Sequence, residues 1–135
     1  MPVINRERGA RMQKFRIGMV GVGETGTPLL KQLLDASFVD LVGVADLDLQ
    51  LPGILLAKER GVPVTDNFIE IAEQGERVDI IIDVTGSRKV REDLRRYMQF
   101  SGNTHTVIVH ERVALLMLSL GAGRWVETRH DELSY

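Results

Sequence analysis

The chain has 135 residues, which is the size of one ordinary domain with its own core. Its 44% hydrophobic and 27% charged residues are typical of a globular protein, and a net charge of −2 indicates neither a nucleic-acid partner nor a membrane surface. With no cysteine, disulfide bonds and thiolate chemistry are excluded. No apolar run approaches the roughly 18 residues of a membrane helix, so we expect a protein of the cytoplasm without a membrane partner.

The most informative stretch is FRIGMVGVGETG, residues 15–26. An apolar run of strand length leads into Gly21, Gly23 and Gly26, which have the spacing G-x-G-x-x-G, and leucines follow at helical spacing. A strand, a glycine turn and a helix N-terminus together can receive the pyrophosphate of a dinucleotide. Gly21 would permit the tight turn, Gly23 would let the backbone approach the phosphates, and Gly26 would let the helix pack closely on the strand.

A second apolar run, Val39–Ala45, ends at Asp46, about 20 residues beyond the glycine turn. An acidic residue in this place binds ribose hydroxyls and repels a 2′-phosphate. The sequence therefore predicts NAD as the cofactor, in preference to NADP. The predicted pyrophosphate contacts are the backbone N–H groups of Gly21, Gly23, Glu24 and Thr25. In the alternative interpretation, Asp46 only completes the turn after the strand.

Strands and helices are expected to alternate along the rest of the chain. The predicted strands are 15–20, 39–45, 62–65, 78–84 and 106–109. The predicted helices are 29–36, 51–60, 68–72, a segment beginning after Ser87, and 111–120. This alternation predicts an α/β fold, a Rossmann-like doubly wound parallel sheet of about five strands in three layers, with strand order 3-2-1-4-5.

The start of the first helix has two interpretations. Either Pro28 lies in the first turn of the helix, or Thr27 caps a helix that begins at Pro28. The second would start the helix later than a dinucleotide turn requires. Glu24 lies where its carboxylate could repel a pyrophosphate.

The turn after the fourth strand lies at the predicted switch point of the sheet. Thr85, Gly86 and Ser87 would line a cofactor groove there, or would serve only as a turn and a helix N-cap. Asp83 interrupts the buried run IIIDV, and we expect it to accept backbone hydrogen bonds from the following loop rather than to contact a cofactor or substrate.

His110, Glu111 and Arg112 follow the fifth strand, at the same edge of the sheet. His110 could act as an acid or base, although a lone histidine at a strand end is more often a bystander. His105 and His130 form no metal-binding spacing with it, so no metal site is predicted.

Two helical segments near the predicted site carry charged or apolar residues that the site itself does not use. The helix after Ser87 carries several cations interleaved with acids and is expected to be a solvated face. The segment Glu111–Leu120 has more leucine than one helix face needs, which predicts a homodimer or a partner domain packed against it. We assign residues 1–14 to a mobile arm, 15–121 to the nucleotide-binding domain and 122–135 to a polar tail or linker.

The order of segments resembles the N-terminal domain of the glucose–fructose oxidoreductase/inositol dehydrogenase (Gfo/Idh/MocA) family over residues 15–120. The matching stretches are IGMVGVGETG, LVGVADLD, LAKERGVPVTDNFIEI, VDIIIDVTGS and TVIVHERVA. The resemblance implies a Rossmann domain that binds NAD(P), with Glu111 in the cofactor site. The family's catalytic lysine corresponds to Arg112, which does not readily release a proton, and the family's substrate domain is absent. Homoserine, aspartate and dihydrodipicolinate dehydrogenases look like more distant relatives.

Three hypotheses for function follow. The first is an NAD(H)-binding module that senses or carries the nucleotide, which also fits a resemblance to Rossmann domains of some bacterial sensor proteins. The second is an oxidoreductase completed by another domain or chain, whose catalytic residues and substrate this sequence does not identify. The third is an interaction module that has lost the cofactor, which Glu24, Thr27-Pro28 and Arg112 favour.

Overall fold

The computed structural model describes residues 13–127. Residues 1–12 of the predicted arm and 128–135 of the predicted tail, including His130, lie outside the described part. Five parallel strands form one sheet in the order β3-β2-β1-β4-β5, which confirms the predicted strand order and fold class. The strands are β1 (Phe15–Val20), β2 (Val39–Ala45), β3 (Val64–Thr65), β4 (Ile80–Asp83) and β5 (Val107–Val109).

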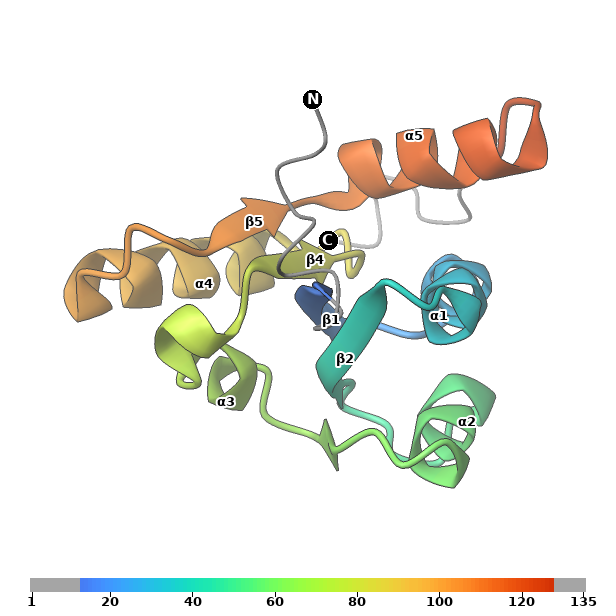
Figure 1. The fold of residues 1–135 in the computed structure, drawn as a ribbon. Coiled ribbons are helices and arrows are strands. Elements are labelled where there is room, and N and C mark those ends of the chain that lie inside the picture. Colours follow the sequence, from blue (N-terminus) through green and yellow to red (C-terminus); the bar gives the residue numbers. More distant parts are fainter. Residues whose placement is uncertain (1–12, 128–135) are drawn as a thin grey trace.

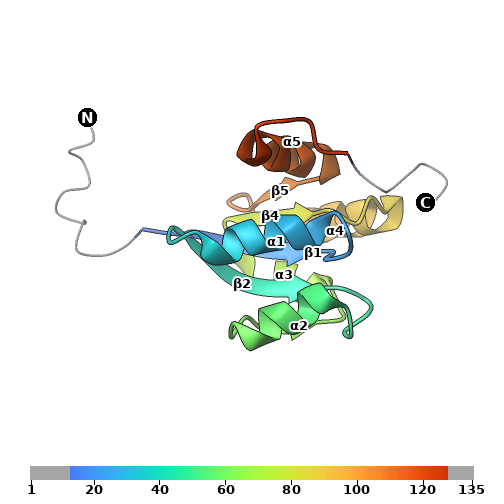
Figure 2. The ribbon, with the colours of Figure 1, turned by 90° about the vertical axis from the view of Figure 1, so that its right-hand side faces the viewer.

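Helices cover both faces of the sheet, as right-handed crossovers between parallel strands require. The helices are α1 (Gly26–Asp35), α2 (Pro52–Glu59), α3 (Ile69–Ala72), the 3₁₀ turn η3 (Gly75–Arg77), α4 (Arg88–Ser101) and α5 (Glu111–Ala122). In Figure 1, α1, α2 and α5 lie to the right of the sheet, while α3 and α4 lie to its left. Figure 2 shows α1 in front of the sheet, between α5 and α2.

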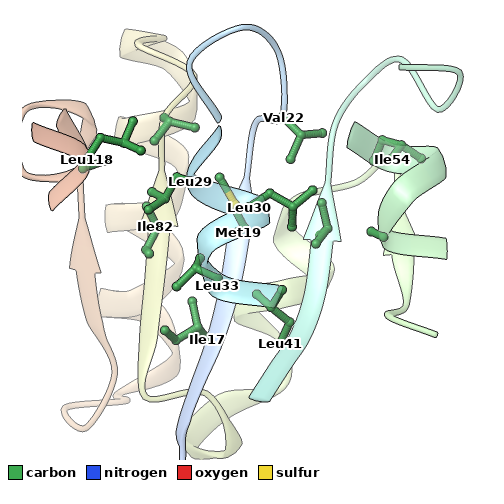
Figure 3. Close-up of a cluster of buried hydrophobic side chains, with 14 residues drawn as sticks. Ile17, Met19, Val22, Leu29, Leu30, Leu33, Leu41, Ile54, Ile82 and Leu118 are labelled. Carbon is green, nitrogen blue, oxygen red and sulfur yellow. The ribbon is translucent and has the colours of Figure 1, made fainter. Parts of the chain in front are cut away.

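The core is divided by the sheet into two apolar clusters. The larger cluster packs β1, β2 and β4 against α1, α2 and α5, and its buried members include Met19, Leu30 and Leu118 (Figure 3). The smaller cluster lies on the other face, where Ile71 of α3 and Leu94 of α4 are buried. Because both faces are covered, β1 and β4 read as nearly continuous apolar runs.

Several predicted element boundaries are wrong by one to three residues; the fourth strand, for example, is Ile80–Asp83 rather than 78–84. Local hydrogen bonds explain the starts of β3 and α1. The third strand begins at Val64 rather than residue 62, because the Val62 N–H bonds to the Ala57 carbonyl at 2.9 Å and closes the end of α2. Gly61, with φ +81°, completes this Schellman-type ending. The first helix begins three residues earlier than expected, at Gly26.

The later helices follow their sequence signals. The Ser87 Oγ accepts a hydrogen bond from the Val90 N–H at 3.2 Å, which confirms Ser87 as the N-cap of α4. Leu94 of α4 is fully buried. α5 continues two residues past its expected end and stops at Gly123, which has a left-handed φ of +71°.

Candidate functional site

The glycine turn connects β1 to α1 and has the backbone geometry predicted for it. Gly21 has a φ of +96°, a region that side chains disfavour, and a Cβ there would lie 3.1 Å from the Thr85 side chain. A Cβ at Gly26 would overlap the Gly21 carbonyl oxygen, so the helix can begin this close to the strand only with glycine. A Cβ at Gly23 would meet nothing within 4 Å. The fold therefore requires Gly21 and Gly26 but not Gly23.

The first turn of α1 accommodates Thr27 and Pro28 without delaying the helix. α1 begins at Gly26, so Pro28 occupies the first turn, where its missing N–H has no helical partner to lose. The Thr27 Oγ1 lies 2.7 Å from the carbonyl oxygens of both Val22 and Gly23, and closes the turn onto the helix. The interpretation of Thr27 as an N-cap is therefore wrong, and the helix starts where a dinucleotide turn requires.

Asp46 follows the end of β2 and is held by the backbone on both carboxylate oxygens. Its Oδ2 accepts a hydrogen bond from the Val22 N–H at 2.9 Å, and its Oδ1 accepts one from the Asp48 N–H at 3.1 Å. The first bond ties β2 to the glycine turn, and the second forms the turn after the strand. The structure therefore confirms that Asp46 completes the turn after the strand. Each oxygen still has a lone pair for another donor, so the ribose interpretation is compatible with the same geometry.

A groove of about 380 Å³ lies at the carboxyl ends of β1, β2 and β4. This volume is within the range of small-molecule sites, and the place is the switch point of the sheet. Among the predicted site residues, the groove is lined by Gly21, Gly23, Asp46, Thr85 and Ser87. Predicted site residues outside its lining are Glu24, Thr25, Gly26, Gly86 and Glu111. Glu24 and Thr25 instead border a smaller hollow beside Pro28 and Leu118.

Sequence reasoning missed the far end of the groove. Leu47, Leu51, Asp66 and Phe68 line it from the segments that follow β2 and β3. The signal was available in the topology, because residues that follow parallel strands gather at one edge of the sheet. This end is apolar apart from its carboxylates.

Asp83 connects two turns at the carboxyl edge of the sheet. It is only 2% exposed, and its Oδ1 accepts hydrogen bonds from the Thr85 N–H at 2.9 Å and the Thr85 hydroxyl at 2.6 Å. The predicted capping of the loop is therefore confirmed. Its Oδ2 lies 3.1 Å from the His110 Nδ1, a contact that the sequence did not predict. A buried carboxylate thus fixes the orientation of a half-exposed histidine.

The Thr85-Gly86-Ser87 turn continues this hydrogen-bonded chain into α4. The Thr85 Oγ1 accepts a bond from the Ser87 N–H at 3.0 Å, and Ser87 in turn caps the helix. Gly86 has a φ of +69°, so the turn conformation favours glycine at this residue. The predicted turn and cap chemistry is present, and two of the three residues also face the groove.

The remaining described histidine belongs to a different cluster. The His105 Nε2 lies 2.7 Å from Asp79 Oδ1, which also pairs with the Arg16 guanidinium at 2.8 Å. Hydrogen bonds from the Arg16 side chain hold the pKa of Asp79 well below its ordinary value. This cluster ties the start of β1 to the segment before β4, away from the groove.

Residues 13–127 contain no group of three or more His, Asp or Glu side chains placed to hold a metal ion. Within the same range, none of the helices has the length and apolar character that crossing a bilayer demands.

Comparisons with known proteins place the fold. No family model matches the chain. An acetaldehyde dehydrogenase of Bacillus thuringiensis (strain Al Hakam) is 33% identical over 81 residues, which are 59% of this chain and 27% of the relative. One of Geobacillus stearothermophilus is 31% identical over 78 residues, or 57% of this chain and 26% of the relative. The matches therefore span about a quarter of these relatives' length.

Solved structures of dehydrogenases superpose on most of the chain. A myo-inositol dehydrogenase from Corynebacterium glutamicum has a TM-score of 0.56 at 17% identity, covering 82% of this chain and 33% of that one. GenD2 from gentamicin A biosynthesis, solved in complex with NAD, has a TM-score of 0.55 at 22% identity and coverages of 82% and 32%. S. aureus homoserine dehydrogenase has a TM-score of 0.55 at 22% identity and coverages of 82% and 30%. The expected resemblance is confirmed at the level of the fold: the chain has the Rossmann fold of the inositol and homoserine dehydrogenases.

Proposed function

We propose that this chain is an NAD(H)-binding Rossmann module, and that the dinucleotide lies in the groove at the carboxyl ends of β1, β2 and β4. The observation that carries the proposal is the groove itself, which joins the glycine turn, Asp46 and the Thr85–Ser87 turn at the switch point of the sheet. Support comes from GenD2, which shares the fold and was solved with NAD.

The pyrophosphate fits best over Gly23 and the N-terminus of α1. Gly23 lines the groove and leaves open space where a side chain would stand, so an anion can approach the backbone closely. α1 begins three residues later and points the positive end of its dipole toward this place. The predicted contact of the Gly21 N–H is not available, because this group bonds to the Ala45 carbonyl oxygen at 2.8 Å, and the Val22 N–H bonds to Asp46 at 2.9 Å. The proposed phosphate contacts lie in residues 23–26, at the start of α1.

The far end of the groove favours NAD over NADP. Leu47, Leu51 and Phe68 provide apolar surface for an adenine ring, and the carboxylates of Asp46 and Asp66 lie beside them. None of the groove-lining residues is a lysine or arginine. A 2′-phosphate would therefore meet two negative charges without a cation to offset them, whereas ribose hydroxyls can donate to Asp46.

The nicotinamide end would lie toward Thr85, Ser87 and Glu111. Thr85 and Ser87 line the groove, and Glu111 begins α5 at the same edge of the sheet. An intact dehydrogenase would add a substrate domain, since this chain matches only about a third of the similar structures. We therefore propose nucleotide sensing or cofactor carriage as the module's role, and place catalysis, where it occurs, with another domain or chain.

Calorimetric titration of the full chain with NAD⁺, NADH, NADP⁺ and NADPH tests the proposal. We expect micromolar NAD(H) binding, weakened about tenfold in Asp46→Ala, a loss of roughly 1.4 kcal/mol. Asp40→Ala is the matched control, because this carboxylate is exposed near the other end of β2. Asp46→Asn separates the structural role of Asp46 from its proposed role in binding ribose, because the asparagine side-chain oxygen can still accept the hydrogen bond from the Val22 N–H. No binding of any of the four nucleotides at millimolar concentration would refute the proposal.

A second candidate function is homo-oligomerisation through α5. Val113, Leu116 and Leu120 are 46%, 56% and 72% exposed, and their i, i+3, i+7 spacing places them on one face of the helix. Trp125 beyond the helix is 75% exposed. Light scattering over a hundredfold concentration range checks this, with Leu116→Lys expected to abolish any dimer. A protein that stays monomeric over the whole concentration range and still binds NAD(H) would refute oligomerisation through α5 and support the nucleotide-binding function.

A further inference from the structure

A second hollow, of about 540 Å³, lies between α4 and β5. It shares no lining residue with the nucleotide groove, although the first turn of α4 borders both. Ser87 and Val90 face the groove, while Arg88 and Arg91 face this hollow. Its volume suits a small molecule. The hollow is therefore a site distinct from the one proposed for NAD(H).

One wall of the hollow is a row of arginines. Arg88, Arg91 and Arg95 occupy positions i, i+3 and i+7 of α4 and so share one face of the helix. Among residues 13–127, none of these three forms an ion pair with a carboxylate. By contrast, two other cations of the same helix are paired with Asp93, namely Lys89 at 2.8 Å and Arg96 at 3.7 Å.

The rest of the lining limits what this row can hold. Glu92 also lines the hollow, so a ligand needs more than one negative charge to gain from three guanidinium groups despite this carboxylate. Met98 and Ile108 contribute apolar surface to the lining. Inorganic ions do not use apolar surface, whereas an organic anion with a short hydrocarbon part does.

His110 adds a fixed polar group on the β5 side. Its Nδ1 is 3.1 Å from the buried Asp83 carboxylate, which can only accept, so Nδ1 carries the proton. The Nε2 has no hydrogen-bond partner among the described residues and is the ring nitrogen available to a ligand. The side chain is 31% exposed. The Asp83 carboxylate thus holds the imidazole ring through Nδ1 and leaves Nε2 directed away from it, as hydrogen bonds at one ring nitrogen orient histidines that bind through the other.

We propose that the hollow between α4 and β5 is a second ligand site, for a small organic anion with two negative charges, as two carboxylates or one phosphate, and a short hydrocarbon part. Arg88, Arg91 and Arg95 bind the charged groups, and the His110 Nε2 orients the ligand. The site does not require NAD(H) to bind elsewhere. Its connection to the groove is the hydrogen-bonded chain from His110 through Asp83 and Thr85 to Ser87.

The test is an NMR titration of the full ¹⁵N-labelled chain at about 150 mM NaCl, where exposed charges are screened. The probes are glutarate, glycerol 3-phosphate and, as a neutral control, glutaramide. We expect saturable shifts in the α4 amides and the His110 ring with at least one anion and none with glutaramide. The tighter anion identifies the ligand as a dicarboxylate or a phosphate ester.

Variants decide whether the arginine row is the cause. The double variant Arg91→Gln/Arg95→Gln should weaken the anion about tenfold or more, because each charge-assisted bond contributes strongly. The matched control Lys89→Gln/Arg96→Gln removes the same charge from the paired cations of α4 and should change affinity less than about twofold. All four residues are exposed, so both variants should fold.

Three results would overturn this proposal. Shifts that stay linear to about 10 mM with both anions would indicate only weak surface association. Equal weakening in the two double variants would show that net charge, rather than the hollow, holds the anion. Displacement of the anion by NADH would place it in the nucleotide groove. Because the last result requires NADH to bind, it leaves the proposed function intact while removing this one.

Discussion

Gly23 and Gly26 belong to one motif, but substitution by alanine should have different effects: at Gly26 it should lower stability, and at Gly23 it should weaken NADH binding without lowering stability. In Gly26→Ala, the added Cβ overlaps the Gly21 carbonyl oxygen and lies 3.0 Å from the Val84 side chain. The main obstacle is backbone, so α1 or the turn must move rather than a flexible side chain. Overpacking of this kind costs about 1–3 kcal/mol, and a backbone clash belongs at the upper end. Alanine's better helix propensity returns at most about 1 kcal/mol, so we expect a net loss of about 2 kcal/mol.

Gly23→Ala should leave stability unchanged. The residue does not have a positive φ, and an added Cβ meets nothing within 4 Å. Because alanine has less conformational freedom than glycine in the unfolded chain, we expect the free energy of unfolding to rise by about 0 to 0.5 kcal/mol. Gly23 does line the groove, however, so a methyl group there would keep the pyrophosphate from the backbone. We expect the Kd for NADH to rise about tenfold or more.

Urea denaturation followed by circular dichroism gives the free energy of unfolding of both variants, and calorimetry gives their affinity for NADH. The expected pattern is a stable Gly23→Ala that binds poorly and a destabilised Gly26→Ala. Equal destabilisation in the two variants would contradict the geometry of the turn. A Gly23→Ala variant that is stable and binds NADH with unchanged affinity would refute the pyrophosphate position.

Two further predictions concern stability. Asp79→Asn should cost about 1 kcal/mol at pH 7. Because pairing with Arg16 lowers the pKa of Asp79 below its unfolded value of about 4, the difference from the parent chain should begin to shrink as the pH falls below about 4 and should still be shrinking at pH 2. Urea midpoints measured from pH 7 to 2 check the sign, and a gap that stays constant or widens over this range would contradict it. Leu30→Ala should cost about 3 kcal/mol because Leu30 is fully buried, whereas Leu55→Ala, at a residue 46% exposed, should cost less than about 1 kcal/mol. Comparable losses in the two leucine variants, measured at unchanged denaturant slope, would count against the packing of α1 on the sheet.

The parts of the fold that depend on local pattern were predictable from the sequence. Val39–Ala45 is a strand with the predicted boundaries because a β-branched run is bounded by a polar segment and by Asp46. The strand order followed from the alternation of elements and the handedness of crossovers. The N-cap at Ser87 followed from residue type and position. The signals for the strand and for the N-cap each lie within one short segment, and the strand order needs only the succession of such segments.

The features that the sequence did not reveal join distant segments. Asp83 and His110 are 27 residues apart, and Arg16 and Asp79 are 63 apart, so neither pairing has a local signal. The early start of α1 depends on the Thr27 hydroxyl reaching back to Val22, which competes with its use as an N-cap. Which residues face the groove, and which face the hollow beside it, depends on the rotation of α4, which only packing determines.

The two ends of β4 carry carboxylates with different roles: Asp79 stabilises the fold, whereas Asp83 positions groups that line the groove and the hollow. At the amino end, Asp79 is balanced by a permanent cation, Arg16, at 2.8 Å, so its charge serves to hold strands together. At the carboxyl end, Asp83 is more deeply buried, and its partners are the Thr85 turn and His110, so no lysine or arginine pairs with it among the described residues. A buried carboxylate without a fixed cation is costly to keep for stability alone. Its value lies in positioning: the same carboxylate orients the turn that faces the groove at the carboxyl ends of β1, β2 and β4 and the histidine that faces the arginine-lined hollow.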